Sequence, residues 1–194
     1  MKLLEIAGIA AFAGLAFGQT PAGFEPAVEA NLAVSFGSKA VEEPGTSFTK
    51  EETAAIPTIG TAEPLKGTYI FAMIDISVPA SFSPGNYEPR RNMLHALVSG
   101  FTSSAEANAD GIYVLENADP SGPAAYIGPS PPAETPPNAH NYVELLFEQT
   151  DAYKAPQVDY SGFNNRLGVD VAELITTLGL GEPVAANYFN VTGV

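Results

Sequence analysis

A proline-rich segment that runs into an apolar strand constrains this chain more than any other stretch. Residues 126–149 read YIGPSPPAETPPNAHNYVELLFEQ. Prolines fix φ and lack an amide donor, which predicts a stiff loop outside any sheet ladder. The β-branched and aromatic residues that follow predict a strand buried on both faces. His140 stands where this loop meets the strand, so it is either a pre-organised site residue or a histidine that hydrogen-bonds only its own backbone. The prolines are Pro129, Pro131, Pro132, Pro136 and Pro137, and the strand residues are Tyr142, Val143, Leu145, Leu146 and Phe147.

A second buried strand is predicted at Thr68–Ile74, which is almost entirely apolar, and Asp75 follows it directly. A carboxylate at the end of a buried strand needs partners, because an unpaired buried charge is costly. Aspartate also caps turns by accepting hydrogen bonds from nearby amides. Both roles are open for Asp75, and they can coexist.

The segment Leu94–Val98 reads LHALV and predicts a third, short strand. Alternation places Leu94, Ala96 and Val98 on one face, and His95 and Leu97 on the other. A histidine on an apolar face is more often a satisfied core residue than a catalyst. The residues alone leave the role of His95 open.

These segments, taken in order, resemble the phosphatidylethanolamine-binding protein family. The resemblance rests on GPSPP, on His140-Asn141-Tyr142 followed by LLFEQ, and on YIFAMIDISVP and LHALV upstream. A closing block at residues 163–191, with an asparagine–arginine pair and EPVAANYFNV, completes it. The resemblance covers residues 24–191.

The resemblance implies a mostly β fold: a β-sandwich with a large central antiparallel sheet, a smaller sheet and a short peripheral helix. It also implies a cavity that binds phosphate or a phospholipid headgroup. Ser77 and Asn141 stand where the family usually has an aspartate and an arginine, which puts any two-carboxylate role in doubt. By resemblance, the ligand-binding residues are Asp75, His95, Pro131, Pro132, His140 and Tyr142.

Local signals organise the rest of the chain. Asp170, with Glu173 at capping-box spacing, and Gly179 delimit a predicted helix over Val171–Leu178. Shorter strands are predicted at 32–36, 54–59, 111–116 and 185–191. Phe24 and Val28 are predicted core residues, and Arg166 a predicted internal hydrogen-bonding residue. Some family members carry a further C-terminal helix beside the pocket; the sequence ends before one could form, so we expect a more open pocket there.

The first 18 residues predict a secretory signal peptide: Lys2, an apolar body, and small residues at Ala16 and Gly18. The apolar run is shorter than the roughly 20 residues that a spanning helix needs, so we expect no transmembrane anchor. Residues 19–194 then form a single domain, and the protein is expected to be extracellular. Asn190-Val191-Thr192 is a glycosylation sequon in that compartment.

The formal net charge of −14 argues against nucleic-acid binding, because so acidic a surface repels phosphate backbones. Without cysteine, disulfides, zinc–thiolate sites and cysteine nucleophiles are excluded.

Three functions remain. The first is a secreted, non-enzymatic protein that binds a small anionic ligand or phospholipid headgroup, with no cofactor. The second is an inhibitor of a serine carboxypeptidase that acts through protein–protein contact, as in one fungal branch that the chain resembles. The third is a metal enzyme with His95, His140 and Asp75 as a two-histidine, one-carboxylate site.

Overall fold

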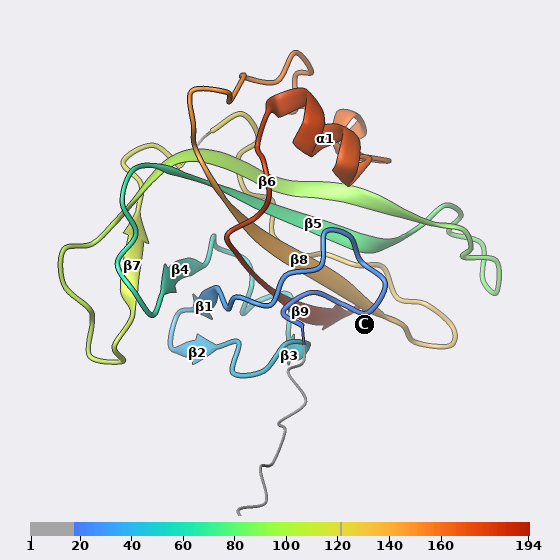
Figure 1. Cartoon of the computed structure of the whole chain (residues 1–194). Coiled ribbons are helices and arrows are strands. Elements are labelled where there is room, and N and C mark those ends of the chain that lie inside the picture. The colour runs from blue at the N-terminus through green and yellow to red at the C-terminus, as the bar shows by residue number, and fades with distance from the viewer. Residues whose placement is uncertain (1–17, 121) are drawn as a thin grey trace, which may run out of the picture.

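The computed structural model describes residues 18–120 and 122–194 (Figure 1). The predicted signal peptide at residues 1–18 lies, except for Gly18, outside the described residues and stays a prediction. The strands are β1 (Ala33–Phe36), β2 (Lys39–Ala40), β3 (Thr46–Phe48), β4 (Thr58–Thr61), β5 (Tyr69–Pro79), β6 (Arg90–Ser103), β7 (Tyr113–Glu116), β8 (Ala139–Glu148) and β9 (Ala185–Thr192). A 3-10 helix, η1 (Phe163–Arg166), and an α-helix, α1 (Val171–Leu178), complete the described elements.

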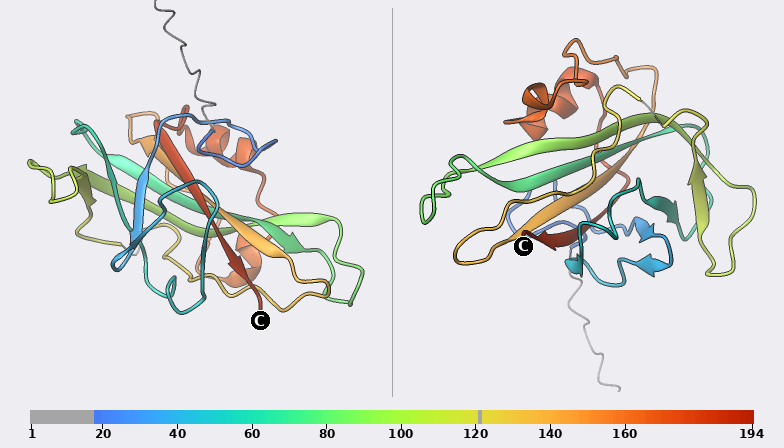
Figure 2. Two further views of the ribbon diagram at one scale, coloured as in Figure 1. Left: turned by 90° about the horizontal axis from the view of Figure 1, so that it is seen from below. Right: turned by 180° about the vertical axis from the view of Figure 1, so that it is seen from behind.

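The strands of the described residues form one curled sheet in the order β2-β1-β4-β7-β6-β5-β8-β9-β3. The four long strands β6, β5, β8 and β9 are antiparallel neighbours, which confirms the predicted central sheet. The expected division into two sheets of a sandwich is not confirmed, because β7 pairs with both β4 and β6 and so joins the two parts. Figure 2 shows the long strands crossing the molecule, with the short strands β1 to β4 gathered on one side.

Each face of the central sheet carries its own apolar core. The face toward α1 buries Ile70, Val143, Leu145 and Phe147 together with the predicted anchors Phe24 and Val28. The opposite face, inside the curl, buries Phe71, Tyr142, Leu146 and Phe189 with side chains from the short strands. Strands covered on both sides explain the near-continuous apolar runs in the sequence. The prediction that both strands, β5 and β8, are buried is confirmed, because Phe71, Leu145 and Phe147 are at most 1% exposed.

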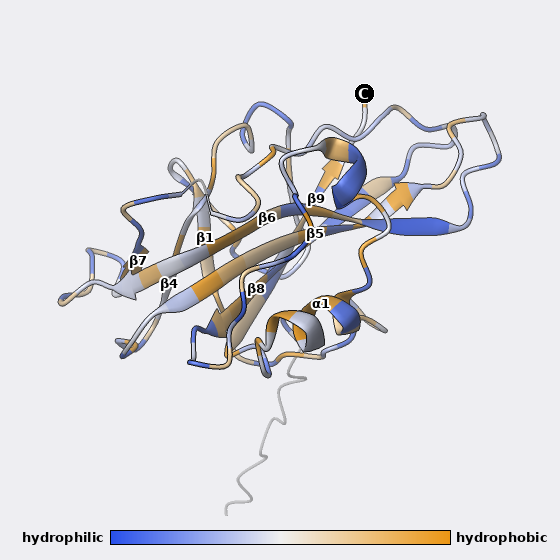
Figure 3. Cartoon of the chain, turned by 90° about the horizontal axis from the view of Figure 1, so that it is seen from above, coloured by the Kyte–Doolittle hydropathy of each residue, from blue (hydrophilic) through white to orange (hydrophobic). Residues whose placement is uncertain are grey.

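Helix α1 begins and ends where its sequence signals predicted. The Asp170 side chain accepts a hydrogen bond from the Glu173 amide at 2.9 Å, and Gly179 ends the helix with a left-handed φ of 64°. The helix buries Val171, Leu174 and Leu178 against the sheet. Figure 3 shows hydrophobic and hydrophilic residues on the same short helix, as an amphipathic helix requires. No helix in the described part of the chain has the length and apolar character needed to cross a membrane.

Three local predictions need correction. Strand β5 does not end before Asp75 but continues to Pro79, with an irregularity in its pairing with β6 after Asp75. Strand β8 begins at Ala139, so His140 lies in the strand and not in the loop. The strand predicted at 54–59 lies instead at Thr58–Thr61, because Pro57 interrupts the earlier part of that run.

The predicted alternation in Leu94–Val98 is wrong because β6 bulges at His95. In the pairing with β5, Leu94 faces Ile74 and Ala96 faces Met73, which leaves His95 without a partner. Leu94 therefore packs on the α1 face together with Leu97, while Ala96 packs on the inner face. A bulge inserts one extra residue and re-aims the side chains beside it. Here it turns His95 toward the cavity described below.

Candidate functional site

A cavity of about 250 Å3 opens at the ends of β5, β6 and β8, and all six predicted ligand-binding residues line it. β5 supplies Asp75, the bulge in β6 supplies His95, and β8 supplies both His140 and Tyr142. Pro131 and Pro132 come from the loop before β8. The structure therefore brings together residues that are up to 67 positions apart, from Asp75 to Tyr142. The remaining lining residues are Val78, Phe82, Met93, Ile127, Gly128, Ser130 and Phe163.

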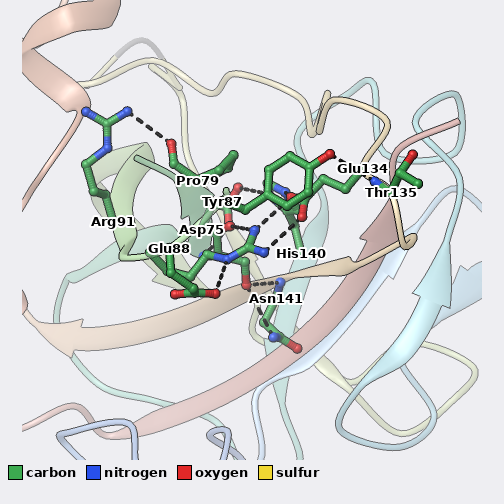
Figure 4. Close-up of polar contacts among 11 residues, drawn as sticks. Asp75, Pro79, Tyr87, Glu88, Arg91, Glu134, Thr135, His140 and Asn141 are labelled. Carbon is green, nitrogen blue, oxygen red and sulfur yellow. Dashed lines mark hydrogen bonds and ion pairs between the residues drawn. The ribbon is translucent and has the colours of Figure 1, made fainter. Parts of the chain in front are cut away.

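His140 is held between two carboxylates (Figure 4). Its Nδ1 lies 2.8 Å from Asp75 Oδ2, and its Nε2 lies 3.1 Å from Glu134 Oε1. Carboxylate oxygens accept hydrogen bonds, so both ring nitrogens donate and the imidazole is protonated. Burial by itself lowers the pKa of His140, but the bonds and charges of Asp75 and then Glu134 outweigh burial and raise it. His140 is therefore an imidazolium that is already saturated by the protein.

Glu134, which the sequence analysis missed, does not line the cavity but lies next to it and contacts His140, which does. Its carboxylate accepts bonds from both terminal nitrogens of Arg90, at 2.7 Å from Nη1 and 2.9 Å from Nη2. This bidentate pair, helped by the bond from His140, outweighs the opposing effect of burial and lowers the pKa of Glu134 below its ordinary value. Arg90 also donates from Nε to Glu88 at 2.9 Å and from Nη1 to the Ser77 carbonyl at 3.0 Å. The result is a continuous chain of alternating charges from Asp75 to Glu88.

His95 is in the opposite protonation state to His140. Its Nδ1 lies 2.7 Å from the Ile127 carbonyl, which can only accept, so Nδ1 carries the proton. Burial lowers the pKa of His95, and the bond to Ile127 only partly opposes that shift. The ring is therefore neutral, and its Nε2, which has no hydrogen-bond partner among the described residues, presents a lone pair. The cavity thus holds one cationic and one neutral histidine.

The His95 bulge is fixed by bonds to its own backbone. The His95 carbonyl accepts from the Ile127 amide at 2.9 Å and from Arg166 Nη1 at 3.2 Å. Arg166 also donates to the carbonyls of Tyr160 and Ala125. The prediction of Arg166 as an internal hydrogen-bonding residue is confirmed, and its bonds hold the backbone that carries a cavity histidine.

Tyr142 lies between the two histidines. Its ring packs edge-on against His95, with centroids 5.1 Å apart, and roughly parallel to His140 at 6.5 Å. Burial, and then the neighbouring Asp75 carboxylate, raise the pKa of Tyr142 far above its ordinary value. The hydroxyl therefore stays protonated, and its hydrogen bond goes to Asp75.

Asp75 plays both roles that the sequence allowed. Its Oδ1 accepts from the Ser77 amide at 2.8 Å, while Oδ2 orients His140. The two positions that depart from the family pattern also contact each other, because Ser77 Oγ accepts from the Asn141 amide at 3.0 Å. A neutral pair thus occupies the two positions where the family usually has an aspartate and an arginine. The nearby guanidinium comes instead from Arg90 on β6.

The mouth of the cavity is apolar and exposed. Phe82 and Phe163 both line it, and they are 63% and 56% exposed. Large aromatic side chains seldom stay so exposed in a soluble domain without a contact to make. Gly193, just after β9, packs against the carbonyls of Pro131 and Pro132 so closely that a Cβ there would clash. The chain beyond β9 therefore supports the proline wall of the cavity.

The geometry also bears on two other sequence-based expectations, a metal site and a glycan on Asn190. Within residues 18–120 and 122–194, no group of three or more histidine, aspartate or glutamate side chains is arranged to hold a metal ion. Asp75 binds the ring of His140 instead of converging with it on a common point. Asn190 lies within β9, and its side-chain amide donates to the Gly45 carbonyl at 3.0 Å. That bond uses the nitrogen that would carry a glycan, and glycosylation stays a prediction.

A weak sequence signal pointed to Glu134, one of the two missed residues, but none pointed to Arg90. Glu134 is the only acidic residue between Gly128 and Asn141, in a loop otherwise made of small, polar and proline residues. A single acid in a rigid loop beside a histidine is a recognisable pattern. Arg90, by contrast, lies 44 positions from Glu134, and nothing local to it indicates the pair.

Comparison with known proteins places most of the chain in one family. The family model described as phosphatidylethanolamine-binding protein matches residues 27–189. A relative from Talaromyces stipitatus, named phomoidride biosynthesis cluster protein N, is 30% identical, and the match covers 88% of each chain.

Solved structures share the fold at lower identity. The carboxypeptidase Y inhibitor, in the complex with its cognate proteinase, has a TM-score of 0.60 at 17% identity, over 87% of this chain and 85% of that chain. A phosphatidylethanolamine-binding protein from Plasmodium vivax has a TM-score of 0.55 at 19% identity, over 84% of this chain and 85% of that chain.

Proposed function

The chain belongs to the phosphatidylethanolamine-binding protein family, and we propose that it is a non-enzymatic binding protein whose cavity holds a small, mainly apolar ligand. The observation that carries this proposal is the cavity of about 250 Å3 beside His95, His140 and Tyr142, with two exposed phenylalanines at its mouth. Concave sites with an apolar lining and a few convergent polar groups are typical of small-molecule binding.

The polar groups favour a ligand that donates a hydrogen bond over a free anion. Both N–H groups of His140 and the N–H of His95 are already engaged. The free lone pair at the cavity belongs to His95 Nε2, which accepts from a hydroxyl, amide or ammonium group. This revises the sequence-based expectation of a simple anion pocket. A neutral lipid or another small organic molecule fits better than inorganic phosphate.

The name of the T. stipitatus relative supports a biosynthetic small molecule as one kind of ligand. Delivery of this protein to the extracellular space through residues 1–18 is part of the same proposal. The experiment is isothermal titration calorimetry of residues 19–194 with dihexanoylglycerol, dihexanoyl phosphatidylethanolamine and inorganic phosphate. Dihexanoylglycerol is expected to bind, and phosphate is expected to bind at least about tenfold more weakly.

Two matched variants locate the binding. Phe163→Ser removes an exposed aromatic at the cavity mouth and should weaken dihexanoylglycerol binding severalfold. Val184→Ser removes an exposed apolar side chain that does not line the cavity and should leave binding unchanged. Equal binding by both variants and the unaltered chain would contradict the cavity as the site.

A second candidate is inhibition of a serine carboxypeptidase. It is favoured by the fold shared with the carboxypeptidase Y inhibitor and by the exposed Phe82 in the β5–β6 loop. If this is the function, the purified chain should inhibit a serine carboxypeptidase at a one-to-one ratio. Such inhibition should persist when dihexanoylglycerol saturates the cavity. No inhibition at micromolar concentration would remove this candidate.

A further inference from the structure

Glu134 has the surroundings of a bound anionic ligand, although it belongs to the chain itself. It stands in the loop before β8, yet its side chain is only 1% exposed. Three hydrogen bonds from two cations reach its two oxygens: two from Arg90, at 2.7 and 2.9 Å, and one from His140, at 3.1 Å. Bidentate contact with a guanidinium plus one imidazolium donor is a complete recognition set for a carboxylate or phosphate.

The two cations of this contact lie on the sheet, whereas the carboxylate lies on a loop. Arg90 opens β6 and His140 stands near the start of β8, so the sheet holds both cations. Glu134 lies in the connection before β8, where the amide of the neighbouring Thr135 donates to Tyr87 Oη at 3.0 Å. Arg90 keeps 22% of its side chain exposed, so the anion position can be reached from solvent. An acidic ligand could take the place of Glu134 without any change in the sheet.

We propose that Glu134 determines which ligands the cavity accepts, because its carboxylate fills the anion position between His140 and Arg90 and reserves the cavity for ligands without a negative charge. This inference rests on the proposed function as a small-ligand binding protein. An acidic ligand binds in this arrangement only by displacing Glu134. The tethered carboxylate is present at a high effective concentration, so displacement is unfavourable. Removing it should convert the site into an anion site.

The test is calorimetric titration of inorganic phosphate into the unaltered chain, Glu134→Ala and Glu134→Gln at about pH 6, where a histidine beside Asp75 stays protonated. Glu134→Ala opens the position and should bind phosphate at least about tenfold more tightly than the unaltered chain. Glu134→Gln keeps the shape of the side chain and supports the fold, and it should give an intermediate gain. Adding Arg90→Gln to Glu134→Ala should remove the gain.

Glu88→Gln is the matched control. Glu88 binds the same guanidinium through Nε at 2.9 Å, but it is 73% exposed and makes no contact with His140. Removing its charge leaves Glu134 in place, so phosphate affinity should change by less than about twofold. A gain in Glu88→Gln as large as in Glu134→Ala would show that general charge, not the occupied position, limits anion binding, and would overturn the inference.

The folding of each variant and its phosphate binding are measured separately. Circular dichroism and thermal unfolding establish that each variant is folded, and a folded Glu134→Ala or Glu134→Gln that binds phosphate no better than the unaltered chain overturns the inference. Phosphate binding by the unaltered chain as tight as by Glu134→Ala also overturns it. Dihexanoylglycerol binding should be the same in Glu88→Gln and in the unaltered chain. If no protein binds dihexanoylglycerol but Glu134→Ala binds phosphate more tightly than the unaltered chain, the proposed function is wrong. The assignment of the anion position to Glu134 is then still supported.

Discussion

Strand β8 carries a buried histidine and a buried glutamate on one face, four residues apart, in contrasting environments. At its start, His140 has a carboxylate at each ring nitrogen, within 3.1 Å. In its middle, Glu144 is 0% exposed, and neither of its carboxyl oxygens has a hydrogen-bond partner in the described part of the chain. Alternation along the strand places both on the inner face, together with Tyr142 and Leu146.

The difference shows that neighbours, not burial alone, decide the charge of a buried group. Burial raises the pKa of Glu144 well above its ordinary value and so favours the neutral carboxylic acid. At the other end, the surrounding charges overcome burial and keep His140 protonated. The end with His140 therefore has the charged partners of a binding site. The end with Glu144 instead lowers the stability of the core, because its carboxyl group is buried without a hydrogen-bond partner.

The largest expected effect comes from breaking the paired end. His140→Phe keeps the ring but removes both donors, which leaves Asp75 and Glu134 buried without their shared cation. We expect a loss of about 3–5 kcal/mol in the free energy of unfolding. His95→Phe is the matched control, since only the bond to Ile127 is lost, and should cost about 1–3 kcal/mol. Denaturant unfolding at neutral pH measures both, and equal losses would contradict the contrast between the two histidines.

The next effect comes from repairing the unpaired end. Glu144→Met replaces an unpartnered carboxyl with an apolar side chain of similar length in an apolar core. We expect the protein to gain about 1–3 kcal/mol of stability at neutral pH. Glu144→Gln is the control, because it removes the ionisable group and keeps a buried polar one, and it should gain less. A loss of stability in Glu144→Met would mean that the carboxyl has a stabilising partner.

The two ends also differ in their dependence on pH. The unfolded chain releases the Glu144 proton above a pKa of about 4.5, while the folded chain retains it, so this group lowers stability as pH rises. The difference in stability between the unaltered chain and Glu144→Gln should therefore widen from about pH 5 upward, by at most about 1.4 kcal/mol per pH unit. Denaturant unfolding between about pH 4 and pH 9 measures it. A constant difference would contradict a raised Glu144 pKa.

His140 and Glu134 act in separate pH ranges. The raised pKa of His140 contributes stability that is complete below about pH 6.5 and is lost as pH rises through the folded value. The lowered pKa of Glu134 contributes stability that is present above about pH 4.5 and is lost as pH falls through the folded value. In the Glu144→Gln background, stability should therefore be greatest between these limits.

The fold was largely predictable because its signals are local. Apolar runs identified β5 and β8, and the burial of Phe71 and Phe147 follows from their strands being covered on both faces. The ends of α1 were predictable from the capping residues Asp170 and Gly179, whose preferences are conformational. The resemblance to the family supplied the grouping of the six cavity residues, which no local pattern contains.

The charge network of the site was not predictable for a physical reason. The bulge at His95 depends on how β6 is paired with β5, and the Glu134–Arg90 pair joins residues 44 positions apart. Glu144 stands within the apolar run that predicted β8. The sequence does not show whether such a buried acid finds a hydrogen-bond donor. Protonation states depend on such three-dimensional neighbours. The resemblance therefore predicted the six cavity residues, but not the charges of the histidines or the contacts of Glu134 and Arg90.

The smallest expected effect separates the two carboxylates that share Arg90. Glu88 is 73% exposed and accepts one bond from Nε, whereas Glu134 is buried and accepts bonds from both terminal nitrogens. Solvent screens an exposed ion pair, so Glu88→Gln should change the free energy of unfolding by less than about 1 kcal/mol. Glu134→Gln, which removes a charge from buried charge-assisted bonds, should cost about 1.5–3 kcal/mol. Raising the salt concentration should reduce the Glu88 effect further and leave the Glu134 effect almost unchanged, because buried pairs are screened less. Denaturant unfolding of both variants at low and high salt measures this contrast, and equal costs with equal salt dependence would show that burial does not distinguish the two carboxylates.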